Sequence, residues 1–271
     1  MPTYRGNRGN LLQHWVLVEL LASLSQHGAN SLCFLDAYSM SPTATRSPKA
    51  GTDPTAPEFD RVRTCLAEGS STYERVWRSL NQSSTGEYPT SAAFVRHCWE
   101  KQLHLLLCEA DAATADEIAS WLAGLDSDTT SFELHRGDWR KRFQSAMPSG
   151  FDAYYLSFDP NMYDRHAVRA PKSENMYAAD IDIVREALGR LPRRPTVIQL
   201  STYSANGPNK QADVFHDLKP HFSALGFKVT PVRADKAMMS LVFSRDATVM
   251  SDLEGRFCSW LAGNKRQFGP A

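Results

Sequence analysis

Short apolar runs that alternate with helical patterns constrain the fold of this chain more than any other feature. The runs SLCFLDAY, LHLLLCEAD, FDAYYLSFD and TVIQLSTYS are typical of buried strands, and apolar residues at helical spacing lie between them. Such an alternation predicts a mostly parallel sheet with helices on both faces. The stretch FKVTPVRADKAMMSLVFS leaves no room for a helix between its two strands, so one strand near the C-terminus must be antiparallel. We therefore expect an α/β fold with a doubly wound, Rossmann-like sheet.

The length of 271 residues fits one large domain over 1–271 with a smaller insertion inside it. Residues 41 to about 58 hold four prolines and a glycine among small polar residues, which predicts an extended loop. Apolar residues at helical spacing predict one or two helices in 59–86. We interpret 43–88 as a helical insertion subdomain.

Composition limits the cellular location and the partners that can be expected for this chain. No apolar run has the length of a membrane span and MPTYRGNRGN carries no apolar signal region, so we expect a cytoplasmic protein without a membrane partner. The 30 basic and 30 acidic residues give no global attraction to nucleic acid. Local basic clusters remain, and Arg5, Arg8, Arg140 and Arg142 are our candidates for phosphate contacts. The five cysteines show no CxxC spacing, so we expect reduced, buried thiols. The sequence indicates no metal ligands and does not predict the oligomeric state.

Acidic residues stand at the ends of four of the expected strands, at Asp36, Glu109, Asp138 and Asp159. Ligands of open parallel sheets bind beyond the carboxyl ends of the strands. A carboxylate such as Glu109 can accept both hydrogen bonds of a ribose cis-diol. Asp138, with the backbone of Trp139, suits an adenine amine, although it is equally placed to cap the helix that follows. Because no GxGxxG follows the first strand, S-adenosylmethionine fits better than a dinucleotide.

A series of short motifs in a fixed order then points to one family. The motifs are YR at Tyr4-Arg5, GN before HWVLVELL, FLDAYSMSP, YPTS, LLLCEAD, HRGDW and SFDPNMY. In this order, and over nearly the whole chain, they resemble the RlmJ-type 23S ribosomal RNA adenine-N6 methyltransferases. The helical insertion after the first strand also resembles that family's.

The resemblance implies a class I methyltransferase that uses S-adenosylmethionine to methylate adenine N6 in a nucleic acid, with RNA favoured over DNA. It implies a cofactor site lined by His14, Asp36, Tyr38, Ser91, Glu109, Asp138 and Trp139. It implies the catalytic residues Asp159, Pro160 and Tyr163. It implies that the substrate base lies near Tyr4, Arg5, Asn161 and Met162.

The chemistry of such a site requires few groups. Adenine N6 is a poor nucleophile because its lone pair is delocalised into the ring. Asp159 and the carbonyl of Pro160 would accept its two hydrogens, and an aromatic ring would stack on the extruded base. Methyl transfer then depends mainly on proximity and alignment.

Two departures from the family pattern leave alternatives open. The loop DAYSMSPTA lacks the family's glycines, which allow a close approach of the backbone. Met162 stands where the family has its stacking aromatic, so either Tyr163 reaches the base through a bulge or Met162 makes a sulfur contact. The alternatives are a catalytically inactive methyltransferase-fold protein that serves in binding or assembly, and a methyltransferase with another substrate.

Overall fold

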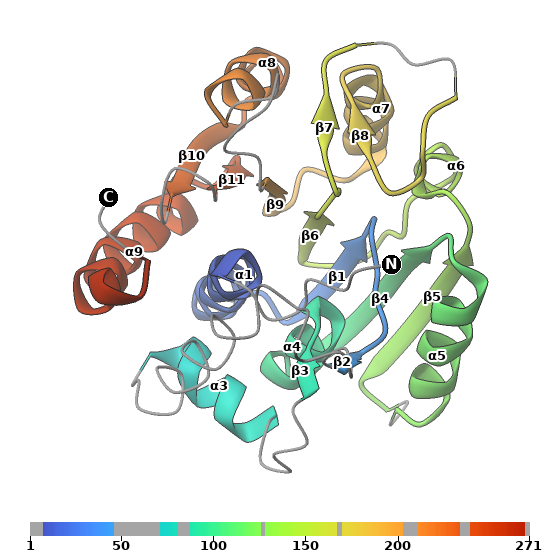
Figure 1. Ribbon diagram of the computed structural model, residues 1–271, viewed down its shortest axis with the longest axis horizontal. Coiled ribbons are helices and arrows are strands. Elements are labelled where there is room, and N and C mark those ends of the chain that lie inside the picture. The colour runs from blue at the N-terminus through green and yellow to red at the C-terminus, as the bar shows by residue number, and fades with distance from the viewer. Residues whose placement is uncertain are drawn as a thin grey trace, which may run out of the picture.

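A computed structural model shows a central sheet with helices on both faces (Figure 1). None of the helices it describes is long and apolar enough to cross a membrane. The structure describes residues 8–45, 71–80, 87–125, 128–166, 170–202, 211–233 and 239–268.

Helices and strands alternate along most of the chain. The helices are α1 Arg8–Gln26, α3 Thr72–Leu80, α4 Ser91–Cys98, α5 Ala112–Ala123, α6 Trp139–Phe143, α7 Asp180–Arg190, α8 Gln211–Ser223 and α9 Ala247–Phe268. The strands of the main sheet are β1 Ser31–Asp36, β4 Gln102–Glu109, β5 Thr130–Arg136, β6 Ala153–Phe158, β9 Thr196–Thr202, β10 Lys228–Arg233 and β11 Met239–Ser244. Two short ribbons are formed by β2 Thr43–Thr45 with β3 Glu87–Pro89, and by β7 Tyr163–Asp164 with β8 Met176–Tyr177.

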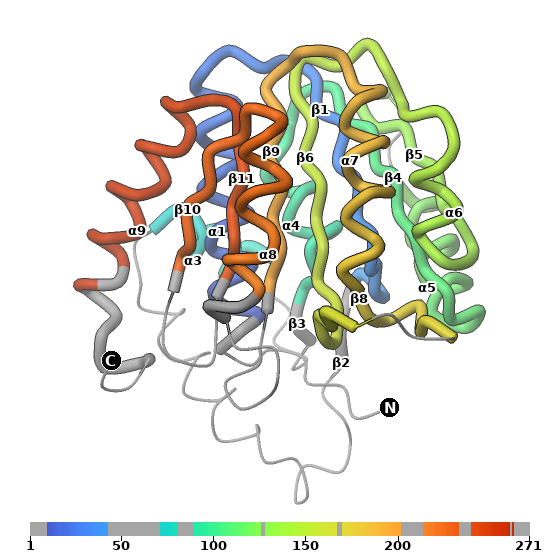
Figure 2. Tube along the Cα trace, turned by 90° about the horizontal axis from the view of Figure 1, so that it is seen from above, coloured from blue at the N-terminus to red at the C-terminus, as the bar shows by residue number. Residues whose placement is uncertain are grey.

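The seven strands lie in the order β10-β11-β9-β6-β1-β4-β5, which Figure 2 shows from left to right. All neighbours are parallel except β11, which runs antiparallel to both β9 and β10. The prediction of a mostly parallel sheet with one reversed strand is confirmed. The strand order changes direction around β1, where Asp36 lies opposite Leu107 on one side and Ser157 on the other. In an open α/β sheet, this is where ligands bind.

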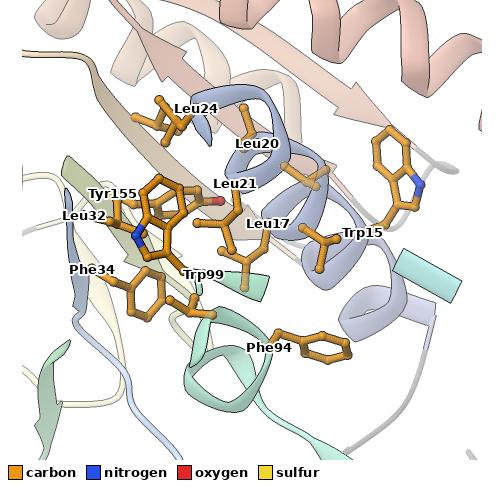
Figure 3. Packing of buried hydrophobic residues seen from close by; sticks show 14 of the residues in the cluster. Trp15, Leu17, Leu20, Leu21, Leu24, Leu32, Phe34, Phe94, Trp99 and Tyr155 are labelled. Carbon is orange, nitrogen blue, oxygen red and sulfur yellow. The ribbon is translucent and has the colours of Figure 1, made fainter. Parts of the chain in front are cut away.

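Alternation along the buried strands gives the sheet two apolar faces. On one face, Leu32 and Phe34 pack in a cluster with α1, α3, α4, α5 and α9. On the other, Cys33 and Leu35 pack with α6, α7 and α8. Figure 3 shows α1 directing Leu17 and Leu21 toward the first face. Each fully buried leucine contributes about 1.5 to 3 kcal/mol, so α1 is held mainly by apolar burial.

A buried polar network connects α1 with the sheet. The amide nitrogen of Gln199 donates to the backbone oxygen of Gln13 and to Ser240 Oγ, both at 2.9 Å. The Tyr155 hydroxyl donates to the amide oxygen of Gln199. These bonds satisfy polar groups that burial would otherwise leave unpaired. They fix the N-terminal half of α1 over β6, β9 and β11.

The chain leaves the sheet after β1 and returns at α4 through the β2–β3 ribbon. Thr90 closes this excursion, since its N–H and its hydroxyl both donate to Pro42 O, at 3.1 and 3.2 Å. Helix α3 lies within the excursion and buries Tyr73 and Trp77 against the cluster around α1 and α4. Most of 43–88 lies outside the described residues, so an insertion subdomain there stays an interpretation.

Two details of the helices differ from expectation. A proline inside a helix normally interrupts it, which predicts a break in α8 near Pro220, but the helix continues to Ser223. Leu218 and Phe222 are buried on either side of the proline and hold this last turn in place. Helix α9 was not predicted. Its buried residues Val249, Met250, Leu253 and Trp260 follow a helical spacing that would have revealed it.

Candidate active site

Asp36, the last residue of β1, is 4% exposed and lies at the change in strand order. Burial raises the pKa of its carboxyl to about 7, although the Tyr38 N–H, which donates to Asp36 Oδ1 at 3.3 Å, lowers it. The negative charges of Asp159 and Glu109 raise the pKa further. The structure thus brings together three of the four predicted acids, from the ends of β1, β4 and β6.

The backbone after Asp36 contacts both neighbouring strands. Ala37 N donates to Ser157 O at 3.0 Å, and Ser39 N donates to Cys108 O at 2.9 Å. The hydroxyl of Tyr38 donates to Asn175 O at 3.1 Å. The loop is therefore anchored to β6, to β4 and to a later segment, without any glycine between 37 and 42.

His14 and Ser91, both predicted in the cofactor site, form one buried contact. His14 Nε2 lies 3.1 Å from Ser91 Oγ, and its ring packs against Phe94 with centroids 4.8 Å apart. Burial lowers the pKa of His14 to about 3, so the ring is neutral near pH 7. Ser91 follows Thr90, which is bonded to Pro42, so this contact adjoins the loop after β1.

Glu109 ends β4 and is half-buried. Its carboxylate accepts the backbone N–H of Asp111 at 2.6 Å. Asp111 in turn caps α5 by accepting the Thr114 N–H at 2.9 Å. The turn thus holds Glu109 at the carboxyl end of the sheet, where the ribose prediction places it.

Asp138 caps α6 and is bound to Arg140. Asp138 Oδ1 accepts the N–H of Arg140 at 2.9 Å, and Oδ2 accepts from the Arg140 guanidinium at 2.8 Å. The Asp138 side chain remains 26% exposed. The Trp139 ring is buried and lies edge-on to Phe143 and Phe158. The capping role predicted for Asp138 is confirmed, and its exposed part leaves room for a ligand contact.

The side chains of residues 159–163, the motif after β6, differ sharply in their exposure to solvent. Asp159 is half-buried, Pro160 is buried and Asn161 is exposed. Met162 is 49% exposed, whereas Tyr163 is 3% exposed and packs in the cluster with α6, α7 and α8. Burial raises the pKa of the Tyr163 phenol. In this conformation Met162, rather than Tyr163, is presented to solvent.

The segment 172–180 borders this motif, although its sequence predicts no role for it. Asn161 N donates to Glu174 O at 2.8 Å, and Met176 N donates to Met162 O at 2.9 Å. The short β7–β8 ribbon is therefore part of the site. At two residues a strand, it gives too weak a pattern to be read from sequence.

The structure corrects the prediction of phosphate contacts for two of the four candidate arginines. Arg140 and Arg142 are both 8% exposed and ion-paired, with Asp180 and with Glu133 respectively, so the prediction that they contact phosphates is wrong. Tyr4 and Arg5 lie outside the described residues, as does the side chain of Arg8. Within the described ranges, no cluster of three or more His, Cys, Asp or Glu residues is placed to hold a metal ion.

The thiols are only partly as expected. Cys33 and Cys108 are buried, Cys98 is half-buried and Cys258 is exposed, and all four are free. Cys65 lies outside the described residues. The prediction of reduced thiols agrees with these four, whereas the expected burial fails at Cys258.

Comparison with solved structures finds a chain of similar overall fold. LPL1258 from Legionella pneumophila is 17% identical, with a TM-score of 0.69 over 94% of this chain and 92% of that chain. yhhF from Escherichia coli is 11% identical, with a TM-score of 0.43 over 86% of each chain. Fibrillarin from Aeropyrum pernix, solved with S-adenosyl-L-methionine, is 10% identical, with a TM-score of 0.40 over 85% and 76%. The last two are too remote to carry an argument.

No family model matches the sequence, and no curated protein matches it. The strand order with β11 reversed is that of class I methyltransferases, and the likeness to LPL1258 supports the overall chain path. The fold is therefore the class I methyltransferase fold.

Proposed function

We propose that the protein is an S-adenosylmethionine-dependent adenine-N6 methyltransferase that acts on nucleic acid, with RNA as the favoured substrate. The observation that carries the proposal is the meeting of Asp36, Glu109 and Asp159 at the ends of three adjacent parallel strands. Carboxylates gathered at this position are suited to a ligand that brings positive charge and hydrogen-bond donors.

The donor set fits S-adenosylmethionine. This cofactor carries a sulfonium and an ammonium, and a nearby cation favours the ionised form of a buried carboxyl such as Asp36. Glu109 would accept the ribose hydroxyls, and Asp138 would accept the adenine amine through the part of its side chain that stays exposed. When bound, the cofactor supplies the activated methyl group.

Asp159 and Pro160 would hold the target amine. They follow β6 directly, and β6 is the neighbour of β1 on the side opposite β4. The Asp159 carboxylate and the Pro160 carbonyl would accept the two N6 hydrogens and orient the nitrogen lone pair. Met162, which is exposed beside them, would contact the extruded base.

A second candidate is a methyltransferase-fold protein that binds a partner without catalysis. The loop after β1 favours it, because residues 37–42 include no glycine and the backbone of Ala37 and Ser39 is bonded to both neighbouring strands. A loop so anchored has less freedom to approach a cofactor closely.

Calorimetric titration with S-adenosylmethionine separates the two candidates. Saturable binding, followed by transfer of a labelled methyl group to RNA that Asp159→Ala abolishes, is the expected result. The adenine-N6 product is identified by digestion of the RNA to nucleosides. Transfer to DNA alone would replace RNA as the substrate. A wild-type protein that binds no cofactor at millimolar concentration would support the second candidate.

A further inference from the structure

Arg140 is a buried guanidinium that joins two parts of the candidate site. Its Nε and Nη2 donate to the two carboxylate oxygens of Asp180 at 2.7 and 2.8 Å, and its Nη1 donates to Asp138 Oδ2 at 2.8 Å. Only 10% of the Arg140 side chain and 7% of the Asp180 side chain are exposed. Bidentate, charge-assisted bonds in such surroundings are stronger and more directional than surface ion pairs.

The charge of Arg140 is secured by its partners. Burial alone would lower the pKa of Arg140, but the hydrogen bonds and charges of Asp180 and Asp138 raise it above its ordinary value. The guanidinium also lies 5.2 Å from the ring centroid of Trp139 and 5.6 Å from that of Tyr177. These contacts hold its plane in one orientation.

The same side chain organises the segment 172–180. Nη2 donates to Asn175 O at 2.6 Å, and Nη1 lies 3.4 Å from Lys172 O. Asp180 Oδ2 accepts the Tyr177 N–H at 2.8 Å. One guanidinium therefore ties the turn at 138–139 to the start of α7 and to the backbone before it.

The segment 172–180 in turn supports the loop that carries the target-base residues. Three backbone bonds join them, from Asn161 N to Glu174 O, from Met176 N to Met162 O and from Ala178 N to Asp164 O, at 2.8, 2.9 and 2.9 Å. Because these bonds are consecutive along both segments, a shift of 174–178 has to be followed by 161–164.

We propose that Arg140 is a positioning residue that couples the adenine-binding turn at 138–139 to the target-base loop at 161–164. The inference rests on the proposed function, since it assigns the turn to the cofactor. The Tyr38 hydroxyl bonds the same carbonyl of Asn175 at 3.1 Å, but it is a neutral donor and makes the weaker link. Cofactor binding stabilises the loop, and by thermodynamic reciprocity an ordered loop strengthens cofactor binding.

Hydrogen exchange with and without S-adenosylhomocysteine tests the coupling. In the wild type, the ligand should slow exchange at the amides of Asn161, Met176 and Ala178 by roughly fivefold or more, the lower end of usual coupling factors. Arg140→Lys should still bind the ligand, but with less than about twofold slowing at these amides. A lysine keeps the charge, yet its single ammonium cannot hold Asp180, Asp138 and Asn175 at once.

Arg142→Lys is the matched control. Arg142 lies on the same helix, its side chain is also 10% exposed, and it is bonded to Glu133 and Ala146. In Arg142→Lys, the ligand should slow exchange at the same amides as much as it does in the wild type. If Arg140→Lys does not fold, Asp180→Asn removes the anchor from the other side and should give the same loss.

The possible results separate the two proposals. If the ligand slows amide exchange in Arg140→Lys or Asp180→Asn as much as in the wild type, the proposed role of Arg140 is overturned. A wild type that binds the ligand without slowed exchange in 161–178 overturns it as well, and leaves the proposed function standing. A wild type that binds no ligand removes the proposed function and this inference with it.

Discussion

Met162 and Tyr163 are consecutive residues that face opposite environments, with 49% of the methionine and 3% of the tyrosine exposed. The main chain explains the contrast. Tyr163 begins the β7–β8 ribbon opposite Met176, which is also buried, so its side chain is directed into the cluster with α6, α7 and α8. Met162, which the sequence places at the expected stacking position, is thus exposed, while the aromatic Tyr163 belongs to the core.

Tyr163→Ala should lower the free energy of unfolding by about 3 to 5 kcal/mol, because it removes a buried ring. Met162→Ala should change that free energy by less than about 0.5 kcal/mol, since the side chain is half exposed. Urea unfolding measures both. If Tyr163→Ala were as stable as the wild type, the ring would not be part of the core. That Tyr163 serves catalysis stays a prediction, and Tyr163→Phe, which keeps the ring, tests it.

Asp36 should destabilise the free protein above neutral pH. Its folded pKa of about 7 lies above the ordinary value of 3.8, so its contribution to stability is full below pH 4 and is lost as the pH rises through 7. Asp36→Asn should therefore gain about 1 to 3 kcal/mol at pH 8 and little at pH 4. Unfolding measured at both values provides the check, and an equal effect at the two would contradict the burial of an ionisable group.

The same carboxyl should make cofactor binding depend on pH. Positive charge on S-adenosylmethionine favours ionised Asp36, so affinity should rise as the pH increases from 6 to 8. Glu109 and Asp159 also contribute charge there. Calorimetry on the wild type and on Asp36→Asn separates the contribution of Asp36 from that of the other two carboxylates. The variant should bind the cofactor more weakly at pH 8, and its affinity should depend less on pH. A wild-type affinity that is flat over this range would place the cofactor away from Asp36.

Glu109→Ala should weaken cofactor binding by about 1 to 3 kcal/mol, since it removes charge-assisted hydrogen bonds to the ribose. The fold should persist, because the carboxylate is half-buried at a strand end and accepts the N–H of a turn residue, Asp111. Glu109→Gln, which keeps the shape, is the matched variant. Unchanged affinity in folded Glu109→Ala would remove this residue from the site.

Binding to RNA should weaken with added salt, because lysines displace counterions from phosphates. With Arg140 and Arg142 buried, Lys141 and Lys172 are exposed candidates near the site. Lys172→Ala should lower the slope of log K against log salt by about one unit or less. Filter binding at several salt concentrations measures the slope. A wild-type constant that does not depend on salt would favour a substrate without phosphates.

The sequence predicts most of the fold because each buried strand appears in it as a short, mostly apolar run. SLCFLD and AYYLSF are mostly apolar, and the structure finds both fully buried at the centre of the sheet. Elements held by few buried residues were missed or misjudged. Over residues 247–260 of α9, only Val249, Met250, Leu253 and Trp260 are buried, and the residues that surround Pro220 outweigh the local preference of proline.

The candidate site is predictable in part for a related reason. Acids that end parallel strands lie at the same edge of the sheet, so Asp36, Glu109 and Asp159 could be expected near one another. Arg140 is buried in an ion pair with Asp180, which lies forty positions away in the sequence. No local sequence pattern connects the two residues. An arginine in a basic run is read as a surface charge until its partner is known.

Pro42 and Thr90 are 48 positions apart and share two hydrogen bonds. Closing a loop costs only about 0.6 kcal/mol more for each doubling of its length, so the chain between them can vary in size with little penalty once the closure exists. Selection can therefore lengthen or shorten the parts of this stretch outside α3, whose Tyr73 and Trp77 are buried in the core, while the strand ends keep their geometry. The same closure marks a place where a foreign segment can be grafted beside the site.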